Sequence, residues 1–158
     1  MTLQSTKQLP ISLKTGRKTD VRSQFAALCF RIRNDKPEVL LITSRGSRRW
    51  IIPKGWPMHD KTPGESALQE AWEEAGVKGK AYERCLGIYS YNKYIDGKKG
   101  LPCVAMVYPI KVKSLEDRFP EKGQRRRKWF TPKKAAVKVT EPELKQILKT
   151  FDPKLLKY

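Results

Sequence analysis

Acidic residues are scarce in this sequence, and their scarcity is the first constraint on its partners. The chain has 158 residues, with 16 Asp and Glu against 34 Lys and Arg, so its formal net charge is +18 at pH 7. Such an excess of positive charge indicates a polyanionic partner, which can be nucleic acid, an acidic membrane surface or a heavily phosphorylated small molecule. The charge carries no information about the fold.

Cysteines and long apolar segments are scarce as well. The three cysteines Cys29, Cys85 and Cys103 are odd in number and widely spaced, which argues against a disulfide scaffold and a zinc site. The longest apolar runs, such as Phe25–Phe30, are too short to span a bilayer, and no apolar signal core is found near the N-terminus. We therefore expect no membrane association and a cytoplasmic location; the oligomeric state stays open.

The most specific stretch of the sequence runs from Trp50 to Val77. Within it, Thr62 is a good N-cap, Pro63 occupies the first helical position, and Glu65 follows Thr62 by three residues, which together form a capping box. A glycine, Gly76, stands where a left-handed residue is wanted at the end of a helix. The pattern predicts a helix over Pro63–Ala75.

Three glutamates, Glu70, Glu73 and Glu74, fall on one edge of this predicted helix. Like charges at this spacing repel one another, and the helix dipole disfavours anions near a C-terminus. One interpretation is a solvated acidic face. The other is a site for a divalent cation, because Mg²⁺ prefers hard oxygen ligands and would turn the repulsion into attraction.

The same stretch resembles the Nudix box, the signature motif of the Nudix hydrolase superfamily. Gly55 supplies its first glycine and the run from Glu70 to Val77 supplies its end, without a gap in the spacing. The resemblance implies a Nudix-type α/β/α sandwich around a mixed β-sheet. It also implies Mg²⁺ or Mn²⁺ as cofactor, bound by Glu70, Glu73 and Glu74, with the backbone carbonyl of Gly55 as a further ligand.

Two positions depart from the family pattern. Lys61 stands where the family has glutamate, and Gln69 stands where it has arginine. In the family these two residues are thought to pair and to brace the loop against the helix. Because both partners are changed, no unpaired charge is left behind, and we expect Glu65 to hydrogen-bond Gln69 instead.

The rest of the chain predicts one domain over residues 21–158, preceded by a flexible basic arm over residues 1–20. Hairpins and irregularly alternating strands and helices favour a mixed sheet in an α/β sandwich. The expected strands are Phe25–Phe30, Val39–Thr43 (joined to the first by a turn at 34–37), Trp50–Ile52, Ala81–Ser90, Cys103–Val112 and Lys128–Thr131, with a polar loop at Tyr91–Gly100. Pro132–Val137 is expected to be helical, and Thr140 and Glu143 form a second capping box.

Two basic runs carry the candidate substrate contacts. Arg45, Arg48, Arg49 and Lys54 lead into the glutamate loop without an intervening acid, and Arg125 opens the run before Trp129. A solvated surface is one reading; the other is a phosphate site, because arginine binds phosphate oxygens in pairs and lysine binds as a point charge.

The flanks resemble the diphosphoinositol-polyphosphate and diadenosine-polyphosphate hydrolases within the superfamily. That resemblance rests on Leu28–Arg31, Ser44-Arg45, Arg49–Pro53 and 125–130. It implies that Arg22, Ser44, Arg45 and Arg125 contact phosphates. Gln24 stands where those relatives have an arginine, and Lys54 replaces a glycine of the animal members.

These observations favour a divalent-metal-dependent hydrolase that cuts a phosphoanhydride bond in a polyphosphorylated small molecule. We expect the catalytic residues to be Glu70, Glu73 and Glu74, of which Glu73 or Glu74 would orient or deprotonate the attacking water. Two alternatives stay open. One is a catalytically weak Nudix-like module that binds a nucleotide or RNA, and the other is removal of pyrophosphate from RNA 5′ ends. A nucleic-acid partner is possible but not favoured.

Overall fold

The computed structural model describes residues 21–95 and 98–156, so the predicted basic arm over residues 1–20 lies outside the described residues. The strands are β1 (Arg22–Arg33), β2 (Lys36–Thr43), β3 (Trp50–Ile51), β4 (Lys54–Gly55), β5 (Val77–Ala81), β6 (Gly87–Ile95), β7 (Lys98–Leu115) and β8 (Arg127–Phe130). The α-helices are α1 (Pro63–Ala75), α2 (Pro132–Lys138) and α3 (Pro142–Lys149), followed by a 3₁₀ turn at Pro153–Leu155. No helix in the described ranges is both long and apolar enough to cross a membrane.

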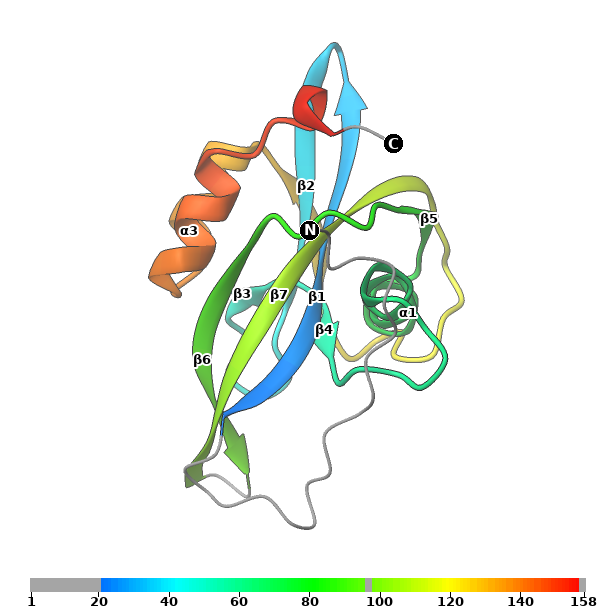
Figure 1. Cartoon of the computed structure of the whole chain (residues 1–158). Coiled ribbons are helices and arrows are strands. Elements are labelled where there is room, and N and C mark those ends of the chain that lie inside the picture. The colour runs from blue at the N-terminus through cyan, green and yellow to red at the C-terminus, as the bar shows by residue number, and fades with distance from the viewer. Residues whose placement is uncertain (1–20, 96–97, 157–158) are drawn as a thin grey trace.

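The strands form one mixed sheet with β1 near its centre (Figure 1). Residues Arg22–Phe30 of β1 run parallel to Cys103–Lys111 of β7. The end of β1 pairs antiparallel with one edge of β2, and β3 pairs antiparallel with the same edge farther along the strand. Strand β8 pairs antiparallel with the opposite edge of β2. On the far side of β7, both β5 and β6 pair with it antiparallel. This arrangement confirms the mixed sheet expected from the sequence.

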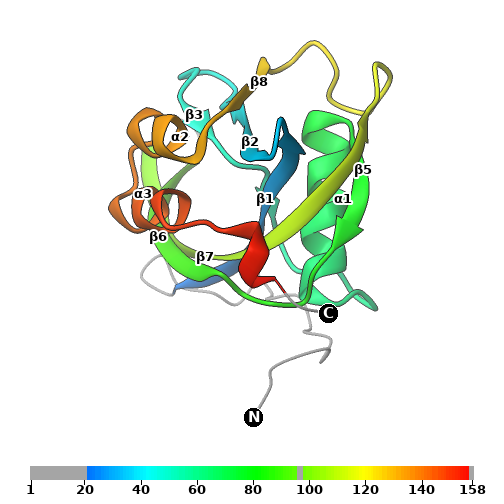
Figure 2. The same cartoon turned by 90° about the horizontal axis from the view of Figure 1, so that it is seen from above.

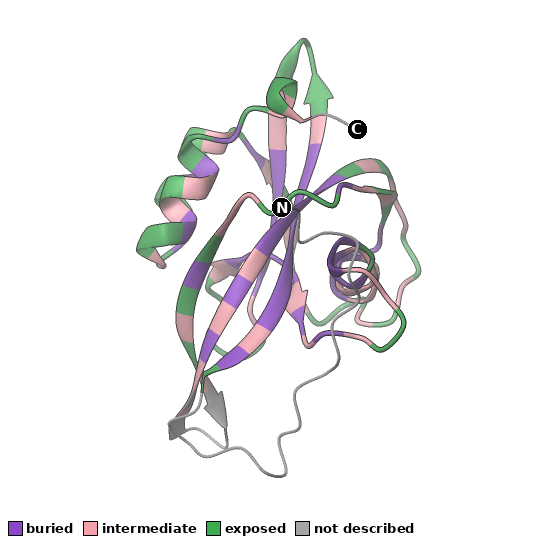
Figure 3. Ribbon diagram, in the orientation of Figure 1, coloured by how far each residue is buried: buried purple, intermediate pink, exposed green. Residues whose placement is uncertain are grey.

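Helices cover both faces of the sheet, with α1 on one side and α2 and α3 on the other (Figures 1 and 2). Side chains alternate across a strand, so a strand between two helical layers must be apolar on both faces. Alternate residues of β1 fill two cores: Phe25 and Ala27 pack with Ala71 of α1, whereas Ala26 and Leu28 pack with Leu144 of α3. The buried centre of the sheet is visible in Figure 3. The predicted α/β/α sandwich is therefore confirmed.

The predicted hairpin between the first two strands is confirmed, but its turn is shorter than expected. Asn34 and Asp35 alone connect β1 to β2, with φ angles of 51° and 63°. Two consecutive residues with positive φ make the tight turn that suits the twist of paired strands, and Asn and Asp tolerate that conformation well. Strand β2 therefore begins at Lys36, inside the predicted turn at 34–37.

Two predictions in the middle of the chain were wrong. The expected strand Ala81–Ser90 is divided into the end of β5 and the start of β6 by a linker that is not strand. At the two ends of this linker, the backbone N–H groups of Tyr82 and Leu86 donate to the carbonyls of Pro109 and Val107. The expected loop Tyr91–Gly100 is largely strand, since β6 pairs with β7 as far as Ile95 and Lys98. Backbone N–H and C=O groups can pair between strands whether the side chains are polar or apolar. The polar composition of this stretch was therefore not enough to predict a loop.

The predicted capping box at Thr140 was also wrong, although the helix behind it is present. Helix α3 has Glu141 as its N-cap, without a side-chain cap, and Pro142 at its first position. A residue before proline is biased to extended backbone, which moves the helix start by one residue. The Glu143 carboxylate instead accepts a hydrogen bond from the backbone N–H of Ser90, at 3.0 Å, and so ties α3 to β6.

The C-terminus of α1 is capped by an arginine from a distant strand. The last turn of α1 contains no basic residue. The Arg127 guanidinium, at the start of β8, donates to the carbonyl of Ala75 at 2.7 Å and to that of Glu116 at 2.9 Å. A cation at this position satisfies an orphan carbonyl and complements the helix dipole.

Replacement of this arginine should destabilise the fold without touching the candidate site. We expect Arg127→Ala to lower the free energy of unfolding by about 2 kcal/mol, because two charge-assisted hydrogen bonds to backbone carbonyls are lost. Arg118→Ala, at an exposed position of the same segment, should change it by less than about 0.5 kcal/mol. Urea unfolding of both variants measures this, and equal losses would contradict the capping role.

Candidate functional site

The helix that carries the three glutamates is built as the sequence predicted. The Thr62 side chain accepts from the backbone N–H of Glu65, and the Glu65 carboxylate accepts from that of Thr62 at 2.8 Å. Gly76 closes the helix in the left-handed region, at φ 70°. These caps fix both ends of α1, and its alanine face holds it against β1.

Two of the three glutamates meet in the site. Glu70 and Glu74, one turn apart, share a hydrogen bond between their carboxyl groups, and Glu74 is only 7% exposed. Burial and then the neighbouring Glu74 charge raise the pKa of Glu70 well above the ordinary carboxyl range. Burial also raises the pKa of Glu74, although Arg125 and Lys54 oppose the shift. The pair is therefore held close at a cost that an additional cation would remove.

Gly55 makes room for this pair. The backbone of strand β4 lies so close to α1 that a Cβ on Gly55 would collide with the carboxyl group of Glu70. Any side chain at this position would displace that carboxyl group. The close approach gives a structural reason for the first glycine of the motif, and it places Gly55 in the wall of the same pocket as the two glutamates.

The third glutamate faces elsewhere. Glu73 does not line the pocket, and its carboxylate accepts a hydrogen bond from the Gln69 side chain at 3.1 Å. Gln69 was expected to hydrogen-bond Glu65; its side chain donates to Glu73, and the Glu65 carboxylate accepts from the backbone N–H of Thr62 in the capping box. In the described residues no three carboxylate, histidine or cysteine side chains are grouped as ligands of one ion. The structure brings together a pair, and the three-glutamate set stays a prediction.

Cations from four segments surround the carboxylate pair in a pocket of about 660 Å³. The predicted substrate residues in its wall are Ser44, Arg45, Arg49, Lys54 and Arg125. Of these, Arg125 is held most firmly: its guanidinium donates to Glu121 and to the carbonyl of Thr43, each at 3.2 Å, and lies 3.9 Å from Glu74. Residues separated by up to 81 positions therefore meet in one pocket.

Lys54 forms the inner cation of this pocket. Its ammonium group lies 4.7 Å from the centre of the Tyr91 ring. Burial lowers the pKa of Lys54, and the Glu74 charge acts in the opposite direction. The Tyr91 hydroxyl in turn donates to the Gln24 side chain, which is itself buried. Lys54 is thus a desolvated cation supported by an aromatic face and a carboxylate.

Two predicted substrate residues do not line the pocket. Arg22 is buried at the start of β1, beside Cys103 in the strand register. Arg48 lies on the exposed loop outside the pocket, where its guanidinium contacts the carbonyl of Gln124 at 3.4 Å. The Ser44 hydroxyl does line the pocket, but it accepts a hydrogen bond from the backbone N–H of Arg49 and so shapes the loop.

Three residues that line the pocket were not predicted as site residues from the sequence: the acidic Glu121, and the polar pair Gln24 and Tyr91. Glu121 lines the wall and holds Arg125, yet it lies in a charged segment without a pattern that would mark it. Gln24 and Tyr91 also line the pocket. The departure at Gln24 was the only signal for this polar pair, since its partner stands in a stretch predicted to be a loop.

The residues present fit a divalent cation. Two carboxylates and a backbone carbonyl are hard oxygen donors of the kind that Mg²⁺ and Mn²⁺ prefer. Burial raises the pKa of both carboxyl groups; the Glu74 charge adds to the rise at Glu70, and Arg125 and Lys54 only partly oppose it at Glu74. A cation at the pair would favour the ionised forms of both.

Comparisons with known proteins agree with this geometry. A model of the NUDIX domain matches residues 22–151. Human diphosphoinositol polyphosphate phosphohydrolase 3-alpha is 35% identical over 111 residues, which cover 69% of this chain and 63% of that protein. Nudix hydrolase 12, mitochondrial, of Arabidopsis thaliana is 36% identical over 105 residues, which cover 64% of this chain and 51% of that protein. The match thus spans less than two thirds of the length of these relatives.

Solved structures show the same fold. A C. elegans Ap4A hydrolase in a binary complex superimposes with a TM-score of 0.62 at 21% identity, over 81% of this chain and 93% of that one. A NUDIX hydrolase from Nitrosomonas europaea superimposes with a TM-score of 0.63 at 16% identity, over 88% of this chain and 97% of that one.

Metal should stabilise this protein in a pH-dependent manner. Raised carboxyl pKa values mean that the folded metal-free protein keeps protons that the unfolded chain releases above its ordinary value of 4.5. Their stabilising contribution is present below that value and is lost as the pH rises toward neutral and beyond. Saturating Mg²⁺ or Mn²⁺ should raise Tm by about 5–10 °C, and by more at about pH 8 than at about pH 6, because ligands must be ionised.

Differential scanning fluorimetry with and without a chelator measures this shift. Glu70→Gln and Glu74→Gln should each remove most of the increase in Tm. Asp60→Asn removes a carboxylate from an exposed loop position and should leave the increase unchanged. A full metal-induced shift in both glutamine variants would contradict the assignment of the pair.

Proposed function

This chain belongs to the NUDIX family, and on that premise we propose that it hydrolyses a phosphoanhydride bond in a polyphosphorylated small molecule, with Mg²⁺ or Mn²⁺ as cofactor. The substrate class we propose is a diphosphoinositol polyphosphate or a diadenosine polyphosphate. The first agrees with the name of the human relative, and the second with that of the C. elegans hydrolase whose fold it shares.

One observation carries the proposal: the cations and the carboxylate pair face the same pocket. The pocket is lined by Arg45, Arg49, Lys54 and Arg125 together with Glu70 and Glu74. Fixed cations bind phosphate oxygens, while ionised carboxylates would repel them unless a cation lies between. A phosphate-rich substrate would pair with the basic side chains of this pocket, and a divalent cation would pair with the two carboxylates. The pocket therefore suits the two ligands bound together better than either ligand alone.

The residues of the chain have separable roles in this proposal. Arg125, held by Glu121 and the carbonyl of Thr43, is a rigid donor to a phosphate group at the base of the pocket. Arg45 is exposed at the rim, where its guanidinium donates to the Gln124 side chain at 3.0 Å, and it binds an outer phosphate. In-line attack on phosphorus depends on such positioning and on charge stabilisation more than on covalent chemistry.

Glu70 and Glu74, with the carbonyl of Gly55, would hold the cation. When bound, the cation supplies neutralisation of phosphate charge and activation of the attacking water. Glu74 is our choice for the residue that orients this water, because it lies in the pocket between Lys54 and Arg125 whereas Glu73 lies outside the lining. Lys54 lies beside Glu74 and opposes the rise of its pKa.

Hydrolysis of a substrate panel tests the proposal. The panel contains diphosphoinositol polyphosphates, diadenosine tetraphosphate, ADP-ribose, nucleoside triphosphates and a 5′-triphosphorylated RNA, each with Mg²⁺ or Mn²⁺. We expect turnover of an inositol or dinucleotide substrate, and a loss of about 100-fold or more in kcat for Glu74→Gln. Turnover of the RNA alone would favour removal of pyrophosphate from RNA ends, and no turnover in the whole panel would contradict the enzyme.

Two neighbouring arginines offer a matched pair for substrate binding. Both Arg45 and Arg48 are exposed and contact Gln124, but only Arg45 lines the pocket. Arg45→Ala should raise KM about tenfold, the effect of about 1.4 kcal/mol of lost phosphate binding, whereas Arg48→Ala should change KM less than about twofold. Steady-state kinetics on the best panel substrate measures both. Equal effects would show that general surface charge, and not the pocket, binds the substrate.

A further inference from the structure

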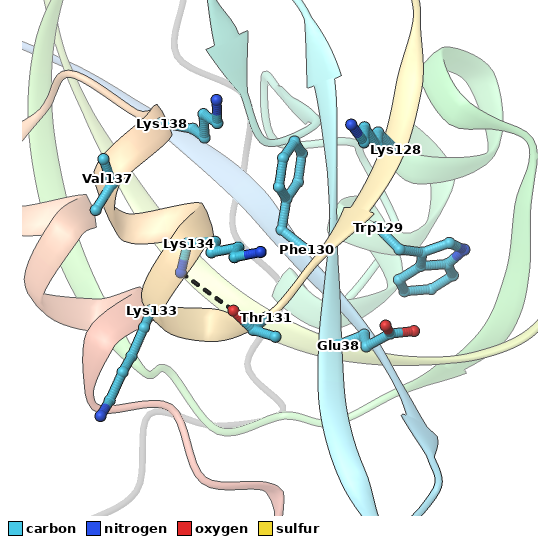
Figure 4. Close-up of a pocket in the computed structure, with 9 residues that line it drawn as sticks. All are labelled: Glu38, Lys128, Trp129, Phe130, Thr131, Lys133, Lys134, Val137 and Lys138. Carbon is cyan, nitrogen blue, oxygen red and sulfur yellow. Dashed lines mark hydrogen bonds between the residues drawn. The ribbon is translucent and has the colours of Figure 1, made fainter.

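A second cavity lies on the other side of strand β8, outside the candidate active site. It is a groove of about 650 Å³ between the outer edge of β8 and helix α2. The residues that line it are Glu38, Lys128, Trp129, Phe130, Thr131, Lys133, Lys134, Val137 and Lys138 (Figure 4). We call it the lysine groove. It shares no lining residue with the pocket that holds the carboxylate pair.

Three lysines in the wall of this groove are directed toward the side on which Phe130 lies (Figure 4). Lys128 approaches from β8, and Lys134 and Lys138 approach from α2, whereas Lys133 on the same helix points away (Figure 4). The ammonium group of Lys128 lies 5.5 Å from the centre of the Phe130 ring. Lys134 and Lys138 are one helical turn apart, a spacing at which like charges repel. The arrangement concentrates positive charge in one place.

Among the residues that the structure describes, no acidic side chain neutralises this charge. None of the three ammonium groups forms an ion pair with any residue in the described ranges. The one acidic residue of the lining, Glu38, is already bound by the Arg31 guanidinium at 2.8 Å. A nearby lysine shows the contrast, since the Lys145 ammonium donates to the carbonyl of Ala136. The groove therefore complements an anion.

The groove is suited to binding and not to hydrolysis. It contains no pair of carboxylates that could hold a divalent cation, and no arginine lines it. Lysine binds a phosphate as a point charge and does not impose a fixed geometry. Val137, which is 76% exposed, adds an apolar contact at its rim. These features suit a chain of phosphates that carries planar, partly apolar groups, such as the bases of a nucleic acid.

The groove and the active-site pocket are joined by a short basic segment. Arg125 lines the pocket and Lys128 lines the groove, so at most about 10 Å of extended chain separates them. Between them, Arg126 is exposed, with its guanidinium 5.5 Å from the centre of the Trp50 ring. A compact anion would occupy one of these positions, whereas an extended polyanion could contact all of them.

We propose that the lysine groove binds the sugar–phosphate backbone of a single-stranded nucleic acid. Lys128, Lys134 and Lys138 contact successive phosphates, and Arg126 continues the line toward the active-site pocket. This site is independent of the proposed hydrolysis of a small polyphosphate. It assigns a binding function to some of the basic residues that give the chain its net charge of +18.

Fluorescence anisotropy with a labelled oligouridylate of about 20 nucleotides tests the proposal. The oligonucleotide carries a 5′-hydroxyl group, so that the active-site pocket has no terminal polyphosphate to bind. The variant is Lys134→Ala/Lys138→Ala, and the control of equal net charge is Lys113→Ala/Lys149→Ala, which removes an exposed lysine from β7 and another from α3, both outside the groove. Hydrolysis of a small polyphosphate is measured beside binding.

The wild-type protein should bind with a steep salt dependence. Removal of Lys134 and Lys138 should reduce the slope of log K against log salt by about 1.4, since each phosphate contact on a single strand contributes about 0.7. The control should retain the wild-type slope, and hydrolysis should be unchanged in both variants. Equal losses in the two variants would overturn the site, as would absence of binding at low salt. Full displacement by tripolyphosphate at equal phosphate concentration would show a compact-anion site and would also overturn the proposal.

Discussion

The site depends on one constraint: two carboxyl groups of like charge must be held together inside the protein. Glu70 and Glu74 lie one turn apart on α1 and share a hydrogen bond, in surroundings that raise the pKa of both. Gly55 provides the space, Arg125 and Lys54 provide part of the compensating charge, and the caps of α1 fix the spacing. Burial of the two carboxyl groups costs stability, and the close approach of β4 restricts position 55 to glycine. Together these features explain why a cation and phosphates fit the pocket.

The wider fold serves the same constraint. Strand β1 is apolar on both faces, so it can hold α1 on one side and the α2–α3 pair on the other. That central position places β4, which pairs with β1, against the glutamate helix. The segment before β8 then brings Arg125 into the pocket, while Arg127, two residues later, caps α1. The segment around the start of β8 thus caps α1 through Arg127 and places the positive charge of Arg125 beside Glu74 of the same helix.

Local chemistry was readable from the sequence, and long-range chemistry was not. The helix Pro63–Ala75 with its caps, the α/β/α sandwich and the first hairpin follow from capping residues and apolar patterns. The resemblance to the Nudix box pointed to the glutamates. By contrast, the partner of Gln69 and the role of Glu143 depend on competing contacts that a pattern does not rank. Glu121 meets Arg125 in a segment without periodicity, so no signal marked it.

The central claim is that cation and polyphosphate meet in the pocket between the carboxylate pair and the arginines. Anomalous diffraction from crystals grown with Mn²⁺ and a non-hydrolysable polyphosphate analogue tests it most directly. We predict a manganese peak within bonding distance of Glu70 and Glu74 oxygens, with phosphate density between that peak and Arg125. Manganese bound at another place, or phosphate density in the lysine groove with none in the pocket, would contradict the account.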